Sequence, residues 1–69
     1  MLLVHMHIGQ PTERMWSALK SSAADEKHAL SLSQALRRVK AIAAREGARE
    51  LPDAALRFYA GEYVLMVRK

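Results

Sequence analysis

The chain has 69 residues, with 11 Lys and Arg, 7 Asp and Glu, three His and no Cys. This length predicts a single domain over residues 1–69, and a domain so small buries only about 60% of its unfolded surface. The lack of cysteine excludes disulfides and zinc sites of the usual cysteine-containing kind. Since the core is small, we expect a homodimer, in which self-association adds stability.

Residues 2–8 alternate as a β-strand does, with four apolar side chains on one face and His5 and His7 on the other. Pro11 suits the first position of a helix, because its missing N–H costs nothing there. Apolar side chains at helical spacing then predict a helix over residues 11–23. The two histidines could bind a metal at this spacing, but no carboxylate or thiol lies nearby in the sequence, so we expect neither a metal nor a cofactor.

The apolar run at the start of the chain, residues 1–4, ends at the first of these histidines. This run is too short, and the residues that follow it are too polar, for a signal peptide or a membrane span. We therefore expect a cytoplasmic protein that makes no contact with membranes.

A second helix follows an expected break over residues 24–30. Ser31 or Ser33 could cap its start, and Gly47 is typical of the position just past its end. An apolar stripe at helical spacing predicts the buried side of this helix. The stripe consists of Leu32, Ala35, Leu36, Val39, Ile42 and Ala43.

The surplus positive charge of the chain lies in this second helical segment, residues 33–49. The segment has five basic residues against one acid, Glu46, which gives +4, whereas the rest of the chain has six of each sign. The basic residues are Arg37, Arg38, Lys40, Arg45 and Arg49. A basic face on one rigid helix is suited to an anionic partner, which could be nucleic acid or an acidic protein surface.

The last third of the chain favours a β-hairpin. Residues 54–60 alternate, residues 63–67 are rich in strand formers, and a short turn containing glycine lies between them. The expected order is β-α-α-β-β, an α+β fold in which two helices cover one face of an antiparallel sheet. Pairing of two copies through the edge of the first or last strand would give the dimer.

Tyr59 and Tyr63, interleaved with Arg57 on this hairpin, are further candidates for a nucleic-acid surface, because tyrosine rings stack on bases and basic side chains bind phosphates. The alternative is that both tyrosines are half-buried in the hairpin. No cysteine, glycine-rich phosphate loop or catalytic set of residues can be assembled from the sequence, so we expect a protein that is not an enzyme.

Residues 3–44 contain LVHMHI, QPTERMWSALK and SLSQALRRVKAIA. These segments resemble the strand, proline-started helix and serine-capped helix of ribbon-helix-helix repressors. The resemblance implies a dimer formed by an antiparallel pair of first strands, with Leu3, His5 and His7 facing the major groove of DNA. That family does not use the outward face of its second helix as its main DNA surface.

The expected element order and the C-terminal segment LRFYAGEYVLMVRK are also similar to RelE-like ribonuclease toxins. This resemblance implies a sheet that carries basic and aromatic residues onto messenger RNA, with Arg57, Tyr59, Tyr63 and Arg68 as candidates. Val64 stands where an arginine commonly follows the Gly-x-Tyr turn in that family.

These observations leave three hypotheses, in order of preference. The first is a small regulatory protein that binds nucleic acid through phosphate contacts of the basic helix. The second is a small inhibitor or adaptor that docks the same helix on an acidic surface of a larger complex. The third is a ribonuclease of the toxin type.

Overall fold

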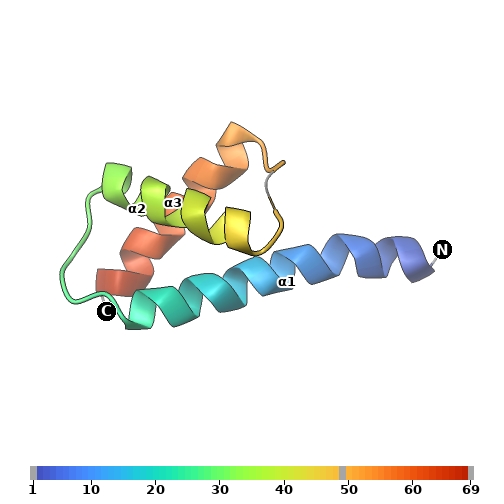
Figure 1. Ribbon diagram of the computed structural model, residues 1–69, viewed down its shortest axis with the longest axis horizontal. Helices are drawn as coiled ribbons and strands as arrows, with labels where there is room; N and C mark the ends of the chain where they lie inside the picture. Colours follow the sequence, from blue (N-terminus) through green and yellow to red (C-terminus); the bar gives the residue numbers. More distant parts are fainter. Residues whose placement is uncertain (1, 49, 69) are drawn as a thin grey trace.

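The protein folds as three helices in the computed structural model, which describes residues 2–48 and 50–68, with side chains from residue 13 onward (Figure 1). The helices are α1 (Leu2–Ala24), α2 (Leu32–Arg45) and α3 (Asp53–Arg68). Neither described range contains a β-strand. The expected α+β fold of order β-α-α-β-β, with its antiparallel sheet, is therefore wrong.

The first helix begins much earlier than the sequence pattern predicts. It runs through residues 2–8, so a strand there is wrong, and its N-terminal part extends past the other two helices (Figure 1). A lone strand would leave its N–H and C=O groups without ladder partners, whereas a helix pairs them within the segment. Pro11 lies inside α1 and, having no N–H, removes one backbone hydrogen bond from it.

This change also separates the two histidines. His5 and His7 are two residues apart, and on a helix such residues do not share a face. The shared strand face expected for them is therefore wrong, and their side chains lie outside the described part of the chain. The strand pairing implied by the ribbon-helix-helix resemblance loses its basis for the same reason.

The ends of α2 are defined by its own sequence. Ser31 is the N-cap: its hydroxyl accepts a hydrogen bond from the Gln34 N–H, and the Gln34 side chain accepts one from the Ser31 N–H. At the other end Gly47 has a positive φ of 77°, and the Ala48 N–H donates to the Ala43 carbonyl. The predictions of a serine cap and of Gly47 just past the helix are confirmed.

The third helix replaces the expected hairpin. Its residues also carry a helical stripe, including Leu56, Tyr59, Tyr63 and Val67, which faces the other helices. Six of its 16 residues are alanine, leucine or methionine, which favour a helix over a strand. Both expected strands, residues 54–60 and 63–67, are therefore wrong, and with them the sheet on which the toxin resemblance rests.

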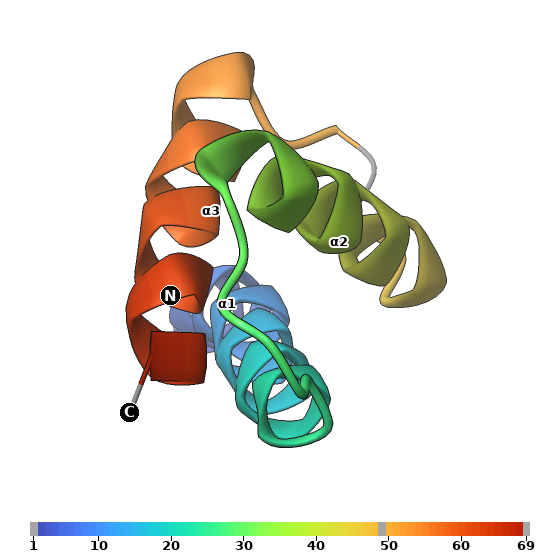
Figure 2. The same cartoon turned by 90° about the vertical axis from the view of Figure 1, so that its left-hand side faces the viewer.

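The core lies where the three helices meet. Figure 2 shows α3 along one edge of the molecule, next to both α1 and α2. Trp16 of α1 packs edge-on against Tyr59 of α3, with ring centroids 5.1 Å apart, and against Phe58 at 6.1 Å. The buried residues are Met15, Leu19, Ala23, Ala35, Val39, Ile42, Ala43, Tyr59, Ala60 and Tyr63.

Candidate anion-binding face of the second helix

Helix α2 is strongly amphipathic in the folded protein. Its buried side consists of Ala35, Val39, Ile42 and Ala43, as the apolar stripe predicts. The opposite side carries basic and small side chains. All of the following are exposed: Ser33, Gln34, Arg37, Lys40, Ala41, Ala44 and Arg45.

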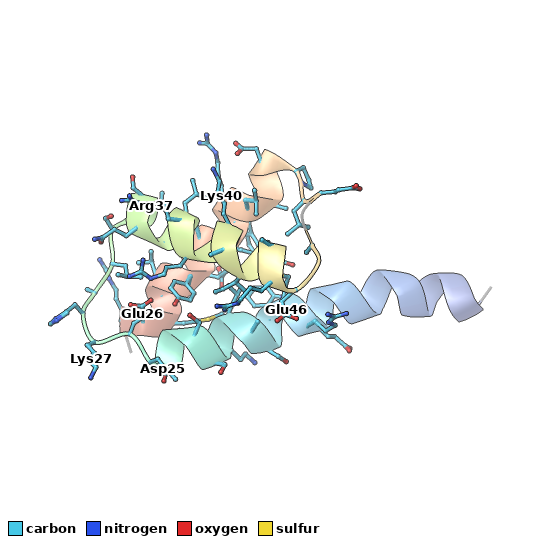
Figure 3. All side chains as sticks on the ribbon, in the orientation of Figure 1. Asp25, Glu26, Lys27, Arg37, Lys40 and Glu46 are labelled. Carbon is cyan, nitrogen blue, oxygen red and sulfur yellow. The ribbon has the colours of Figure 1, made fainter. Side chains whose placement is uncertain are left out.

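Three of the candidate cations, Arg37, Lys40 and Arg45, form the outward face, and we call them the basic triad. Helical geometry places them within an arc of about 140° and spreads them over about 12 Å of the axis. Figure 3 shows Arg37 and Lys40 on the side of α2 that is turned away from α1. None of the triad makes an ion pair with another described residue. The exposed Ala41 and Ala44 keep the surface between them low.

Arg38 has a different environment from the triad. Its Nε donates to Glu26 Oε2 at 2.7 Å, and the same carboxylate oxygen accepts a hydrogen bond from the Tyr63 hydroxyl at 2.9 Å. The Ser22 hydroxyl lies 2.7 Å from the Tyr63 oxygen and donates to it, because the tyrosine proton is already directed at Glu26. This cluster ties the loop between α1 and α2 to all three helices.

Charge within the cluster is balanced at neutral pH. The hydrogen bond from Arg38 holds the pKa of Glu26 below its usual value, and the bond from Tyr63 lowers it further. The same hydrogen bond raises the pKa of the Arg38 guanidinium. Burial raises the pKa of Tyr63. Glu26 is therefore ionised and neutralises Arg38, so that Arg38 adds little to the net charge of the face.

Glu46, the one acid of the basic segment, does not oppose the triad. Its carboxylate lies 3.5 Å from Arg14 Nε of α1, and its carbonyl oxygen accepts a hydrogen bond of 3.4 Å from the same guanidinium. Figure 3 shows Glu46 between α2 and α1. The acid is thus directed to the inner side of α2, and the outward face keeps its positive charge.

The remaining candidates fall into three groups. Tyr59 and Tyr63 are buried side chains of α3, so they do not form the stacking surface considered for them, and they are neither half-buried nor on a hairpin. Arg57 is exposed, and its Nε donates to Asp53 Oδ2 at 2.7 Å one helical turn earlier. Arg49 lies outside the described residues, as do the side chains of the two N-terminal histidines.

Two open hollows lie between α2 and α3, and one of them is beside the basic triad. Lys40 borders one of them, and the exposed Leu32 borders the other. Sequence patterns could not reveal these hollows, because they exist only when residues 53–68 form a helix. The first is lined by Lys40, Ala43, Ala44, Ala48 and Leu56, and the second by Leu32, Ser33, Leu36, Arg57 and Ala60.

Comparisons with known protein families, with curated proteins and with solved structures find no match for this chain. Within the described ranges, none of the helices combines the length and the apolar character needed to cross a bilayer.

Proposed function

We propose that this chain is a small non-enzymatic regulatory protein that binds nucleic acid through the outward face of α2. The observation that supports the proposal is the basic triad: three exposed cations on one helix that contains no acid. Glu46, the one acid of residues 33–49, is paired with Arg14 on the inner side. An uncompensated positive face of this kind attracts the phosphate backbone.

The dimensions of the helix suit this partner. A helix of 14 residues is about 21 Å long, and the major groove of B-DNA, about 12 Å wide, admits an α-helix. Ala41 and Ala44 allow the helix backbone to approach the partner closely. Because Arg37, Lys40 and Arg45 dominate the face, phosphate contacts supply most of the affinity and the sequence of the nucleic acid has little effect.

The test is a double charge reversal, Arg37→Glu with Arg45→Glu, assayed for binding to duplex DNA and to RNA. Both side chains are exposed, so the fold should remain and binding should fall to the background level. Lys20→Glu with Lys27→Glu is the matched control, since it changes the net charge equally at exposed positions outside α2. The control should retain most of the binding.

Salt dependence provides a second measurement for the same proposal. Three phosphates neutralised by the triad predict a slope of about −2.7 in a plot of log affinity against log salt on a duplex. Equal loss of binding in the two double variants would mean that only overall charge matters. Binding that survives the reversal in α2 would place the active surface elsewhere and overturn the proposal.

A second candidate function is docking of the same face on an acidic protein surface. The observation that favours it is the apolar surface near the triad: Leu32 is 59% exposed at the edge of one hollow, and Lys40 borders the other, which is lined mainly by alanine and leucine. Phosphates do not use such a surface, whereas protein interfaces do. Leu32→Ser should weaken binding to a protein partner and leave nucleic-acid binding unchanged. Pull-downs with and without nuclease treatment separate the two partners.

A further inference from the structure

The outward face of α3 is apolar. Ala54, Phe58, Gly61 and Leu65 follow one another at intervals of four, three and four residues, which places them on one stripe of the helix. Phe58 and Leu65 are each 58% exposed. Figure 2 shows this helix at the edge of the molecule, with one side turned away from α1 and α2. Phe58 meets the ring of Trp16, but more than half of each of the two large side chains of the stripe remains exposed.

Gly61 in the middle of the stripe is not required by the fold of one chain. It lies in the helix interior, where glycine destabilises the helix relative to alanine, and its φ is not in the left-handed region. A Cβ atom added at this position would meet nothing within 4 Å. A residue that weakens its own helix, with open space around it, is suited to the close approach of something outside the chain.

We propose that two copies of the chain pair through this face, with their α3 helices antiparallel. In this register each large side chain lies opposite a small one: Phe58 packs over Gly61 of the second copy, and Leu65 over Ala54. The open space at Gly61 is then filled by an aromatic ring. This inference does not depend on the proposed nucleic-acid binding, and it replaces the strand pairing expected from the sequence.

The charges at the ends of α3 agree with the antiparallel orientation. Antiparallel pairing opposes the two helix dipoles and brings Asp53, which is already bonded to Arg57 of its own helix, toward Arg68 of the second copy. Parallel pairing would instead place Gly61 against Gly61 and leave a void at the centre. It would bring Arg57 close to Glu62 of the second copy, but an exposed ion pair of this kind contributes little.

The first test is sedimentation equilibrium of the whole chain at concentrations from about 10 µM to about 1 mM. A seam of one helix is small beside a standard interface of about 800 Å² per partner, so we expect a reversible dimer within this range. Phe58→Ser with Leu65→Ser should weaken dimerisation at least about tenfold. A monomer at all concentrations, or equal dimerisation of the double variant, would overturn the proposal.

Gly61→Gln separates dimerisation from folding. In the single chain its side chain meets open space and glutamine is the better helix former, so thermal stability at low concentration should rise. In the dimer the same side chain occupies the place of the Phe58 ring, so the dimer should weaken. A variant that is more stable and still dimerises as the original chain does would refute pairing at this face.

Cysteine trapping tests the orientation, because the chain has no cysteine of its own. In the antiparallel register Ala54 lies opposite Leu65 of the second copy. The Ala54 residues of the two copies are therefore separated by 11 residues along the helix axis, or about 16 Å. Ala54→Cys alone should therefore form no disulfide, whereas a mixture with Leu65→Cys should form the mixed disulfide readily. Disulfide formation by Ala54→Cys alone, or failure of the mixture to form one, would overturn the antiparallel arrangement.

Discussion

Tyr63→Phe tests the hydrogen-bonded cluster that joins the loop after α1 to the three helices. Tyr63 has no exposed surface, and its ring is part of the core, so the change to phenylalanine keeps the packing and removes only the hydroxyl. The hydroxyl donates to Glu26 at 2.9 Å and accepts from Ser22 at 2.7 Å. Both bonds are lost together.

The expected loss of stability follows from these two bonds. A hydrogen bond to a charged group contributes about 1.5–3 kcal/mol and one between neutral groups about 0.5–1.5 kcal/mol. Glu26 and Ser22 are partly exposed, so hydrogen bonds to water can replace part of those lost with the tyrosine hydroxyl. Glu26 also keeps its hydrogen bond from Arg38. We therefore expect the free energy of unfolding to fall by about 1–2 kcal/mol. For a domain of this size this lowers Tm by about 10 °C.

Urea unfolding followed by the fluorescence of Trp16, the only tryptophan, measures this change. Tyr59→Phe is the matched control, because Tyr59 is also buried in α3 and its hydroxyl makes no hydrogen bond to another described residue. The control should change stability by less than about 0.5 kcal/mol. Equal effects of the two changes would show that the cluster contributes nothing beyond ring packing, and the reasoning would fail.

Further substitutions test the helix ends and the pH dependence. Ser31→Ala removes the N-cap of α2 and should cost about 1 kcal/mol in urea unfolding, whereas Ser33→Ala, at an exposed position inside the helix, should cost nothing. Gly47→Ala should destabilise the fold by about 1 kcal/mol, because alanine is strained at a positive φ. Gly61→Ala should stabilise it by about 0.5–1 kcal/mol, because alanine is the better helix former and its Cβ has room. A change of stability in the same direction for both variants would contradict this reasoning from the backbone conformation. The lowered pKa of Glu26 means that its contribution is present above the unfolded value of 4.5 and is lost as the pH falls through the folded pKa. Glu26→Gln should therefore flatten the stability profile below pH 4.5, and an unchanged profile would show that other carboxylates cause the acid sensitivity.

The second helix and its ends could be predicted from the sequence because their signals are local. The serine cap, the glycine with positive φ and the apolar stripe all lie within the segment from Ser31 to Ala48. The concentration of positive charge is also a property of the sequence alone. Each of these features depends on residues only a few positions apart, so no tertiary contact is needed to produce it.

The segments at the two ends of the chain could not be predicted in the same way. Residues 2–8 and 54–67 each fit a period of two, and the latter also fits the helical period. The choice depended on partners. Without a strand at residues 2–8 the C-terminal hairpin would stand alone, and an isolated hairpin is marginally stable, whereas a helix pairs its own backbone groups. The helical stripe of α3 is then buried against α1 and α2.

The composition of the candidate face was decided by tertiary contacts as well. The sequence places Arg38 beside Arg37 and puts Glu46 next to Arg45, with nothing to distinguish their roles. Folding brings Glu26 to Arg38 across 12 residues and Arg14 to Glu46 across 32. These long-range pairs neutralise Arg38 and Glu46, because opposite charges within a few ångströms of each other cancel locally. The sequence alone determined that α2 is basic, and the tertiary structure decided which of its charges remain exposed to a partner.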